Sequence, residues 1–181
     1  MANEIERKFL VNRIPDSMCP ENKYKHSLLR VAVLEQGYLS TTGPNTSRIR
    51  IETPVTDKAE TTKEYAYLTV KGKRAKDLTR PEFEYEVPAS EGKAMLKLCK
   101  NNVVKKERRS VKMQTAHFEI LVELDIFRKN LKGLVMVEVE FPTAKAAKKF
   151  QPLEWMGKEV TEDKRYTNKN LAISQQIPEM K

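Results

Sequence analysis

Pairs of like charges two residues apart are the feature of this sequence best suited to chemistry. Because residues i and i+2 of a β-strand share a face, each pair would present two like charges side by side. Carboxylates so arranged can bind a hard divalent cation, and guanidinium or ammonium groups can bind phosphate oxygens. The acidic pairs are Glu4 with Glu6, Glu123 with Asp125, and Glu138 with Glu140. The basic pairs are Arg48 with Arg50, and Lys106 with Arg108.

A half-exposed antiparallel sheet offers a simpler explanation for any one of these pairs, because it turns apolar side chains inward and charged ones to water. Taken together, however, the strands keep acids with acids and bases with bases. Like charges close together on one solvent-facing side are unfavourable. A sheet with enough strands can also close and carry its charged rows inside, where ligands and water satisfy them. The set of strands therefore favours an internal charged site.

Alternation of period two predicts that most of the chain forms β-strands. Connections are mostly short, which favours antiparallel pairing, and about eight strands are expected, over residues 4–11, 34–40, 47–52, 65–71, 82–87, 102–112, 118–127 and 134–141. Residues 28–34 are ambiguous between helix and strand, residues 53–63 read as a long polar loop, and residues 18–26 are irregular. The predicted class is α+β with a dominant antiparallel sheet, in one domain over residues 1–181.

A few short helices are expected beside this sheet. Ser90 and Thr143 can each accept a hydrogen bond from the first turn and so cap one helix, and a short carboxyl-terminal helix is expected to start near Thr167. The first helix runs to about residue 99, and the second spans residues 144–150. The third is expected to bury Leu171 and Ile173.

Charge and composition limit the partners and the metal. The 181 residues include 34 basic and 25 acidic side chains, a formal charge of +9, which favours anionic partners such as phosphorylated molecules, acidic lipid or nucleic acid. The cysteines and histidines are too few and too far apart for a disulfide framework or a zinc site, being only Cys19, Cys99, His26 and His117. Any metal is expected to be a hard cation held by carboxylates. Long apolar runs are lacking, so a cytoplasmic setting without membrane contact is expected.

Eight short segments follow one another in an order that is typical of one protein family. The first, Glu4-Ile5-Glu6-Arg7-Lys8, has the pattern Glu-x-Glu-x-Lys. The others are Gln36-Gly37-Tyr38, Arg48-Ile49-Arg50, Thr69-Val70-Lys71, Glu82-Phe83-Glu84, Lys106-Glu107-Arg108, Glu123-Leu124-Asp125 and Val137-Glu138-Val139-Glu140. With these segments the chain resembles the triphosphate tunnel metalloenzymes, also called CYTH proteins, over essentially its whole length. Residues 162–169 are similar to the tail of the small bacterial inorganic triphosphatases.

The resemblance implies a closed, eight-stranded antiparallel β-barrel, or tunnel, with a few flanking helices. It also implies a hydrolase that uses Mg²⁺ or Mn²⁺ to cleave inorganic tripolyphosphate to diphosphate and phosphate. Thiamine-triphosphatase activity and an activity like that of class IV adenylyl cyclases are the alternatives within the family. The first would need an aromatic platform, for which Trp155, Tyr166 and Tyr24 are candidates, although each also suits a packing role. No feature dedicated to a nucleoside is evident, which favours tripolyphosphate.

The same matches imply the site residues. The metal ligands are Glu4, Glu6, Glu138 and Glu140, with Asp125 and Glu123 completing an acidic wall. The phosphate ligands are Lys8, Arg48, Arg50, Lys71 and Arg108, while Lys164 and Lys169 of the tail close one mouth of the tunnel. Arg80 is either a further phosphate ligand or a turn residue.

Lys106 and Tyr38 resemble a pair that is assigned to activating the attacking water in bacterial members. Nearby cations such as Arg108 and Arg50 disfavour the charged amine, which lowers the pKa of Lys106 toward that of a working general base. Tyr38 would hold Lys106 by a hydrogen bond. The alternative is that Lys106 is one more phosphate ligand and that a metal activates the water.

Glu82, Glu84 and Glu86 alternate with apolar residues in one predicted strand. If the apolar residues form the outer row, these acids face the tunnel and orient basic residues or metal-bound water. A solvated acidic row is the alternative.

A non-catalytic module that binds polyphosphate or nucleic acid is the competing class of function. The net charge and the basic runs at residues 71–76 and 105–109 support it. Such a module has no use for the acidic pairs, and the aromatic residues, 7% of the chain, do not interleave with the basic runs. Nucleic acid is therefore not expected as a partner, and the sequence leaves open whether the chain forms a homodimer.

Overall fold

Ten strands and three α-helices make up most of the described chain. The computed structural model describes residues 2–18, 28–40, 42–43, 45–55, 63–73, 80–115 and 118–179. The strands are β1 (Ala2–Glu4), β2 (Glu6–Val11), β3 (Leu28–Tyr38), β4 (Thr46–Pro54), β5 (Tyr65–Lys71), β6 (Arg80–Val87), β7 (Val103–Gln114), β8 (Glu119–Phe127), β9 (Val135–Glu140) and β10 (Met156–Glu159). The helices are α1 (Ala89–Leu98), α2 (Ala144–Lys149) and α3 (Asn168–Ser174), with 3₁₀ turns η1 (Asp16–Met18), η3 (Lys129–Leu131) and η4 (Lys164–Tyr166).

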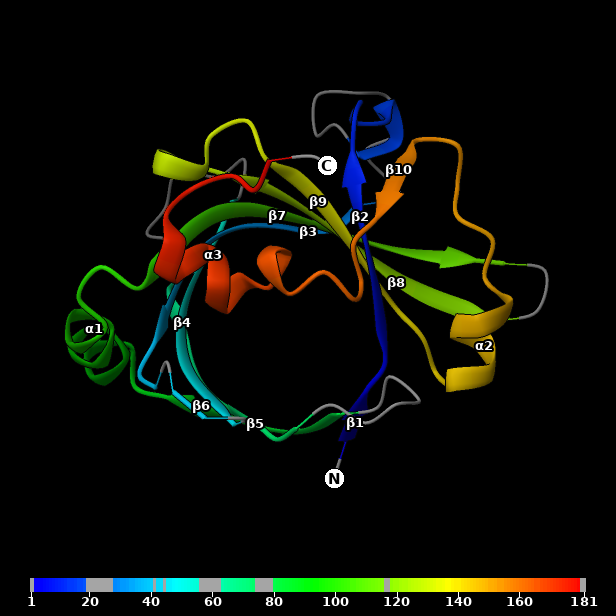
Figure 1. The fold of residues 1–181 in the computed structure, drawn as a ribbon. Coiled ribbons are helices and arrows are strands. Elements are labelled where there is room, and N and C mark those ends of the chain that lie inside the picture. The colour runs from blue at the N-terminus through cyan, green and yellow to red at the C-terminus, as the bar shows by residue number, and fades with distance from the viewer. Residues whose placement is uncertain are drawn as a thin grey trace.

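The strands form one sheet in the order β1-β6-β5-β4-β3-β7-β8-β9-β2-β10. All the pairings are antiparallel. The sheet curves strongly, so that α3 lies on its concave side while α1 and α2 lie on its convex side (Figure 1). Residues 28–34, which the sequence left ambiguous, belong to β3.

The predicted α+β class with a mainly antiparallel sheet is confirmed, but the predicted closed eight-stranded barrel is wrong. In the described part of the chain the order of the strands is open, and the sheet has ten strands, or nine if β1 and β2, which Ile5 alone separates, are counted as one. Ile5 is buried among apolar residues, and its carbonyl accepts a hydrogen bond from the backbone N–H of Phe141. The amino-terminal strand is interrupted at Ile5, and it pairs with β6 before this residue and with β9 after it.

Of the two predicted helix caps, the one at Thr143 is confirmed and the one at Ser90 is not. Thr143 accepts a hydrogen bond from a backbone N–H group of the first turn of α2, as predicted. The third helix starts next to Thr167, as expected, and Thr167 caps it in the same way. The predicted cap at Ser90 is wrong, because α1 begins at Ala89, directly after Pro88, and has no side-chain cap. Proline at this position already supplies a backbone angle φ compatible with helix entry, and the N-cap lies two residues earlier than predicted, at Pro88.

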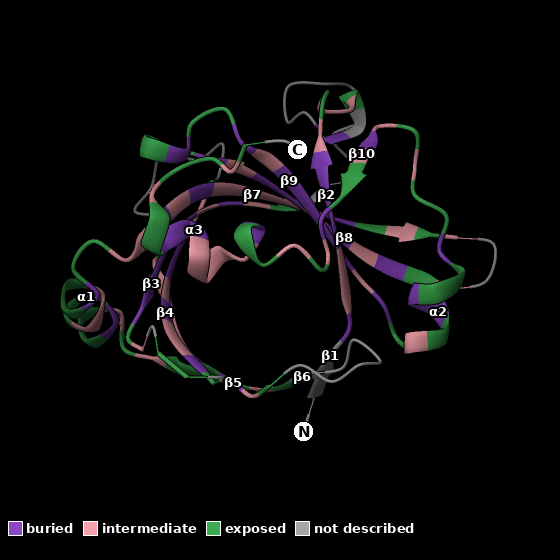
Figure 2. Ribbon diagram, viewed as in Figure 1, coloured by how far each residue is buried: buried purple, intermediate pink, exposed green. Residues whose placement is uncertain are grey.

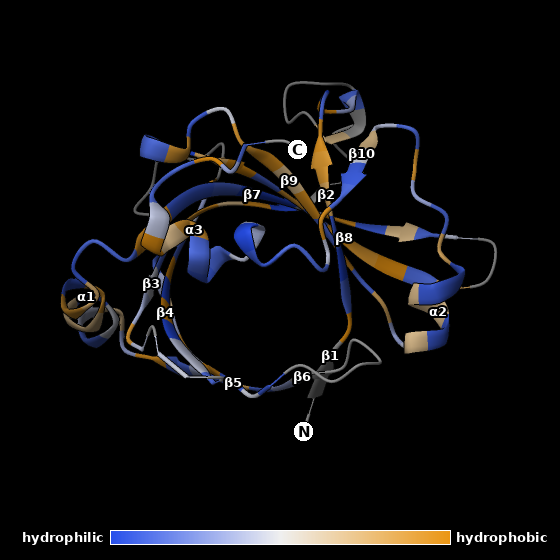
Figure 3. Ribbon diagram, viewed as in Figure 1, coloured by the Kyte–Doolittle hydropathy of each residue, from blue (hydrophilic) through white to orange (hydrophobic). Residues whose placement is uncertain are grey.

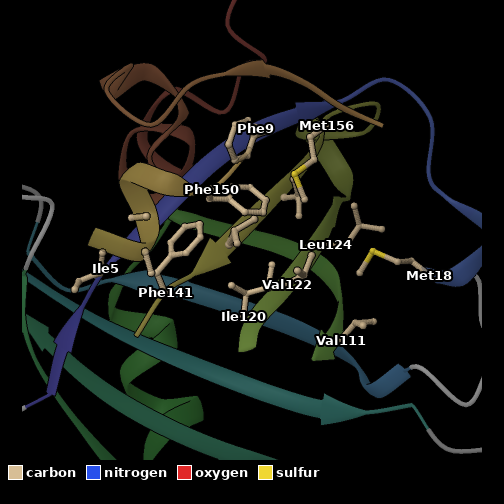
Figure 4. Packing of buried hydrophobic residues seen from close by; sticks show 14 residues of the cluster. Ile5, Phe9, Met18, Val111, Ile120, Val122, Leu124, Phe141, Phe150 and Met156 are labelled. Carbon is tan, nitrogen blue, oxygen red and sulfur yellow. The ribbon is translucent and has the colours of Figure 1, made fainter. Parts of the chain in front are cut away.

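The larger apolar cluster fills the convex side of β2, β8 and β9 beneath α2 (Figure 4). Phe141 and Phe150 pack there with ring centroids 5.1 Å apart. The hydrophobic residues of β8 and β9 contrast with the mainly hydrophilic β7 (Figure 3). Since alternate residues of a strand point to opposite faces, burying this apolar row turns the charged row to the concave side. The buried members are Ile5, Phe9, Met18, Val111, Ile120, Val122, Leu124, Val137, Val139, Phe141, Ala146, Ala147, Phe150 and Met156.

A second apolar cluster holds the carboxyl-terminal segment against one end of the concave face. Tyr166 of η4 and Leu171 of α3 are buried in it, beside Tyr38 of β3 and Val104 of β7. Leu171 is buried as predicted, but Ile173 is 47% exposed, so that part of the prediction is wrong. The segment that carries η4 and α3 therefore covers one end of the concave face from within (Figure 1).

Helix α1 contacts β4 and β5 from the convex side at a glycine. A Cβ atom at Gly92 would come within 2.4 Å of the Cβ atom of Ala66 and 2.9 Å of Ile51 Cδ1. Only glycine allows this close approach. Gly92 is buried, and so is Cys99, which directly follows the helix, while the other residues of α1 are exposed or partly exposed (Figure 2).

Arg7 ties three elements together on the convex side of β2. Its Nε and Nη2 donate to the two carboxylate oxygens of Glu159 at 2.9 and 2.6 Å. Its Nη1 donates to the backbone carbonyls of Ala147 and Phe150 at 3.0 and 2.8 Å. The guanidinium also lies 5.2 Å from the ring centroid of Phe9. Arg7 thus joins β2 to β10 and to the end of α2.

We expect Arg7→Lys to lower the free energy of unfolding by about 1–3 kcal/mol, because an ammonium group cannot make this forked set of bonds. Urea unfolding followed by circular dichroism measures the change. Arg13→Lys, at an exposed position of the following loop, is the control and should stay within about 0.5 kcal/mol of the parent. Equal losses in the two variants would contradict a clamping role for Arg7.

Candidate functional site

Charged side chains from most strands meet on the concave face. The register places Arg108 of β7 opposite Asp125 of β8, and Glu138 of β9 opposite Lys8 of β2. Glu6 lies opposite Glu140. Most of these pairs along a strand have charges of one sign, but the sheet brings acids beside bases across strands.

Lys8 lies between two of the predicted metal ligands. Its Nζ is 2.9 Å from Glu6 Oε1 and makes a short contact with Glu138 Oε1. Burial by itself would lower the pKa of Lys8, but the charges of Glu138 and Glu6 outweigh it and raise that pKa above its ordinary value. The ammonium group therefore stays charged and balances the two carboxylates.

Arg108 is the centre of the acidic wall. Its Nε and Nη2 donate to the two carboxylate oxygens of Asp125, both at 2.7 Å. Nη2 also donates to Glu138 at 2.8 Å, and Nη1 makes a short bond to Glu123. Burial opposes the charged guanidinium, but the charges of Asp125 and Glu123 raise the pKa of Arg108 well above its ordinary value. A single guanidinium thus compensates three acids that the sequence placed near a metal.

Lys106 is almost completely buried in the same network. Its Nζ donates to Asp125 at 2.5 Å and to Asn168 Oδ1 of α3 at 3.2 Å. Burial and then the charge of Arg108 lower the pKa of Lys106 to about 8, although Asp125 opposes the shift. The predicted lowering of this pKa is therefore confirmed, with burial as its largest cause.

Tyr38 does not hold Lys106 as predicted. The Tyr38 hydroxyl accepts a hydrogen bond from Gln36 at 2.6 Å, and among the described residues no bond joins it to Lys106. Burial raises the pKa of Tyr38 to about 12. The two side chains belong to the same concave face, but each has its own hydrogen-bond partners, Gln36 for Tyr38, and Asp125 with Asn168 for Lys106.

Arg48 and Arg50 of β4 and Lys71 of β5 form a basic wall on the concave face. The Arg50 guanidinium donates to Glu84 at 3.1 Å, and its Nε is buried without a hydrogen-bond acceptor among the described residues. Burial and the charge of Arg48 lower the pKa of Arg50. Lys71 pairs with Glu82 at 2.9 Å. Neighbouring cations with an unused buried donor form a surface that suits an anion with several oxygens.

The acids of β6 serve this basic wall. Glu82 lies 3.5 Å from Arg48, and Glu84 accepts from Thr69 at 2.7 Å as well as from Arg50. For these two acids the interpretation that they orient basic residues is confirmed. Phe83 and Tyr85 form the outer row, 40% and 59% exposed, and Glu86 is itself exposed.

Several predicted residues are not brought into this network. Lys164 is exposed at η4, and Lys169 is partly exposed on α3. Trp155 packs against the larger apolar cluster and Tyr166 lies in the second one, so neither forms an aromatic platform on the concave face. The side chains of Glu4 and Arg80 lie outside the described part of the structure. The same holds for residues 56–62 and 74–79, for His117, and for residues 19–27, which include Cys19, Tyr24 and His26.

Two residues that the sequence did not assign to the site belong to it. Gln36 is 1% exposed and contacts both Tyr38 and Arg48. Asn168 contacts Lys106 and donates to Glu138 at 3.4 Å. Both lie inside segments that carried the family resemblance, which is the signal that could have found them. Neutral amides have no charge pattern, so alternation of charges could not reveal them.

The donor types on the acidic wall suit a hard divalent cation, which binds through oxygen. Glu6, Glu123, Asp125 and Glu138 all present carboxylates there. Within the described residues, however, no cluster of three or more acids, histidines or cysteines has the arrangement of a ready-made metal site. The cationic groups of Lys8 and Arg108 lie between the carboxylates instead.

None of the helices in the described ranges has the length and apolar character that a membrane crossing needs.

Comparison with known proteins agrees with this geometry. The chain is 37% identical over 171 residues to an inorganic triphosphatase of Nitrosomonas europaea, covering 94% of this chain and 97% of that protein. It is 34% identical over 172 residues to an inorganic triphosphatase of Acetivibrio thermocellus, covering 94% of each.

Solved structures share the fold. A crystal structure of an inorganic triphosphatase, 34% identical, superposes with a TM-score of 0.62 and covers 99% of both chains. A Pyrococcus horikoshii protein, 21% identical, has a TM-score of 0.52 over 81% of this chain and 84% of that one, which shows the fold alone. The CYTH domain model matches residues 2–172. With this match over nearly all of its residues, the chain belongs to the CYTH domain family.

Proposed function

We propose that this chain is an inorganic triphosphatase that hydrolyses tripolyphosphate to diphosphate and phosphate with the help of a divalent cation. The observation that carries the proposal is the concave face itself, where the basic wall of β4 and β5 belongs to the same sheet surface as the carboxylates of β2, β8 and β9. Two relatives named inorganic triphosphatase, alike over 94% of this chain, support the choice of substrate.

Binding of the triphosphate falls to the basic residues. Arg50 is the strongest candidate, because a phosphate oxygen would supply the acceptor that its buried Nε lacks. Arginines can grip phosphate oxygens in pairs of bonds, and lysines add point charges. The proposed ligands are Lys8, Arg48, Arg50, Lys71 and Arg108, with Lys164 and Lys169 of the tail near one end.

The acidic wall would hold the cation. Mg²⁺ or Mn²⁺ would neutralise charge on the phosphate oxygens when bound. The carboxylates proposed to hold it are Glu4, Glu6, Glu123, Asp125, Glu138 and Glu140.

Lys106 is proposed to take the proton of the attacking water. A neutral amine has two hydrogens and one lone pair. In the structure two acceptors, Asp125 and Asn168, face the Lys106 amine. With both hydrogens so engaged, the lone pair is left to accept a proton. The water oxygen then bonds to a terminal phosphorus, its proton passes to Nζ, and the bridging P–O bond breaks to release diphosphate. Positioning and charge neutralisation carry most of the catalysis.

We expect purified protein to release phosphate from tripolyphosphate when Mg²⁺ or Mn²⁺ is present and to lose this activity with a chelator. ATP and thiamine triphosphate should be poorer substrates, because the described aromatic candidates for a platform pack elsewhere. Glu6→Gln should lower the rate strongly. Glu119→Gln, which removes a 56%-exposed carboxylate from the end of β8, is the matched control and should be as active as the parent.

The outcomes of this assay separate the classes of function. No release from any triphosphate with any metal would contradict the hydrolase. Metal-independent binding of polyphosphate with a steep salt dependence, and without turnover, would indicate a binding module instead. Faster phosphate release from thiamine triphosphate than from tripolyphosphate would indicate a thiamine triphosphatase, which is still a triphosphate hydrolase.

A further inference from the structure

We infer that Gln36 is a positioning residue, which fixes the Tyr38 hydroxyl as a hydrogen-bond donor toward the phosphate oxygens that Arg48 binds. The inference rests on the proposed function, since it concerns the same triphosphate site. It assigns Tyr38 a contact with substrate in place of the predicted hydrogen bond to Lys106.

Gln36 is a neutral side chain buried on a charged face. It lies on the concave side of β3 and is 1% exposed. Its Oε1 accepts a hydrogen bond from Arg48 Nη1 at 3.2 Å, and its Nε2 donates to the Tyr38 hydroxyl at 2.6 Å. The amide therefore links a predicted phosphate ligand to a predicted catalytic residue.

The orientation of this amide follows from the chemistry of its partner. A guanidinium has only donors, so the group of Gln36 that faces Arg48 must be the carbonyl oxygen. The NH₂ group then faces Tyr38, and the phenol oxygen must accept. A hydroxyl that accepts in this bond keeps its own hydrogen for a different partner.

Among the described residues the Tyr38 hydroxyl takes part in one hydrogen bond, the bond that it accepts from Gln36, so its own hydrogen has no acceptor there. Tyr38 is 4% exposed, so this hydrogen is also largely shielded from bulk water. Burial raises the pKa of Tyr38 to about 12, which keeps the phenol protonated at neutral pH. The site thus holds a buried donor whose acceptor has still to arrive.

The sheet register indicates what that acceptor is. Tyr38 lies directly opposite Arg48 in the β3–β4 pair, and Gln36 opposite Arg50. Side chains at opposed positions are close enough to share a ligand. An oxygen of a phosphate held by Arg48 is therefore the acceptor within reach of the Tyr38 hydroxyl. Lys106 donates to Asp125 and Asn168, and among the described residues it has no hydrogen bond to Tyr38.

Gln36→Glu tests this assignment because it reverses one bond and keeps the other. A carboxylate still accepts from Arg48, but it cannot donate to Tyr38, so the tyrosine hydroxyl must turn and donate to residue 36. The substrate then loses its donor although Tyr38 is still present. We expect kcat for tripolyphosphate to fall about tenfold or more, as it should in Tyr38→Phe.

A double-mutant cycle separates this effect from the added negative charge. In the Tyr38→Phe background the donor is already gone, so Gln36→Glu should lower kcat less than about twofold further. Gln36→Met, similar in length and without charge, carries the same cycle if the glutamate variant folds poorly, and unfolding temperatures identify the folded proteins. Equal effects in the two backgrounds, or an unchanged kcat in Gln36→Glu, would overturn the inference.

Affinity keeps this test separate from that of the proposed function. The four proteins of the cycle are also titrated with tripolyphosphate by calorimetry. If the parent binds tripolyphosphate but releases no phosphate, the proposed function fails, and non-additive dissociation constants still support the role of Gln36 while additive ones overturn it. If the parent neither binds nor hydrolyses tripolyphosphate, both are overturned.

Discussion

Replacing Lys106 by methionine should reduce the turnover of tripolyphosphate by a factor of about 10²–10⁴ and leave its dissociation constant within a few fold of the parent value. Lys106 is 1% exposed and held by Asp125 and Asn168. Its removal takes away a proton acceptor, but the basic wall of β4 and β5 keeps its phosphate ligands. Steady-state phosphate release and calorimetric binding measure the two quantities separately.

The preceding residue supplies the control. Lys105 lies on the opposite face of β7 and pairs with Glu35 at 2.6 Å, so Lys105→Met removes the same charge from the same strand outside the site. Its turnover should match the parent. Lys106→Arg distinguishes the two roles considered for Lys106, because arginine can bind phosphate but does not become a neutral base. Substantial turnover in Lys106→Arg, or in Lys106→Met, would contradict the base role.

Replacing Arg108 by methionine should lower the free energy of unfolding by about 3–5 kcal/mol, because it leaves buried carboxylates without their counter-charge. Arg108 bonds to Glu123, Asp125 and Glu138, whose side chains are 13%, 1% and 8% exposed. Lys106 and Lys8 still compensate part of this charge. Urea unfolding in the absence of divalent cations gives the loss.

Lys112→Met is the control for this measurement, since Lys112 of the same strand pairs with Glu119 where both side chains are 56% exposed. Exposed pairs of this kind contribute little, so its stability should change by less than about 0.5 kcal/mol. Mg²⁺ should stabilise Arg108→Met more than the parent, because the space that the guanidinium leaves is surrounded by carboxylate oxygens. If Arg108→Met were as stable as the parent and its free energy of unfolding did not change with Mg²⁺, the idea that the acidic wall needs a cation would be contradicted.

Much of the fold could be predicted because its signals are local. Alternation of period two identified all the longer strands, and it also assigned the charged row of each to one face. Thr143 was recognised as a helix cap, and the start of α3 was placed near Thr167, because a helix start depends on the next few residues only. The short β10 was missed, since Met156–Glu159 shows no clear alternation. The predicted closed barrel was wrong, because the sheet order runs openly from β1 to β10, with the first strand interrupted at Ile5.

The candidate site was predicted as a set of residues but not as a set of contacts. Glu6, Lys8, Arg50, Lys106, Arg108 and Asp125 do face the same side of one sheet. Their partners follow from the register, which pairs residues far apart in the chain: Arg108 meets Asp125 across β7 and β8, and Lys8 meets Glu138 across β2 and β9. The prediction of a hydrogen bond between Tyr38 and Lys106 was wrong, because the register and packing give each side chain other partners.

The sequence by itself therefore determined which side chains are charged, which face of each strand they share, and to which family the chain is similar. Only the tertiary structure decided how those charges are compensated and which neutral side chains orient them. Strand register and burial are set by packing of the whole sheet, including the apolar cluster beneath α2 and the segment of α3 on the concave face. Once water is excluded, a donor such as Gln36 Nε2 must find its acceptor among whatever residues that packing has placed beside it.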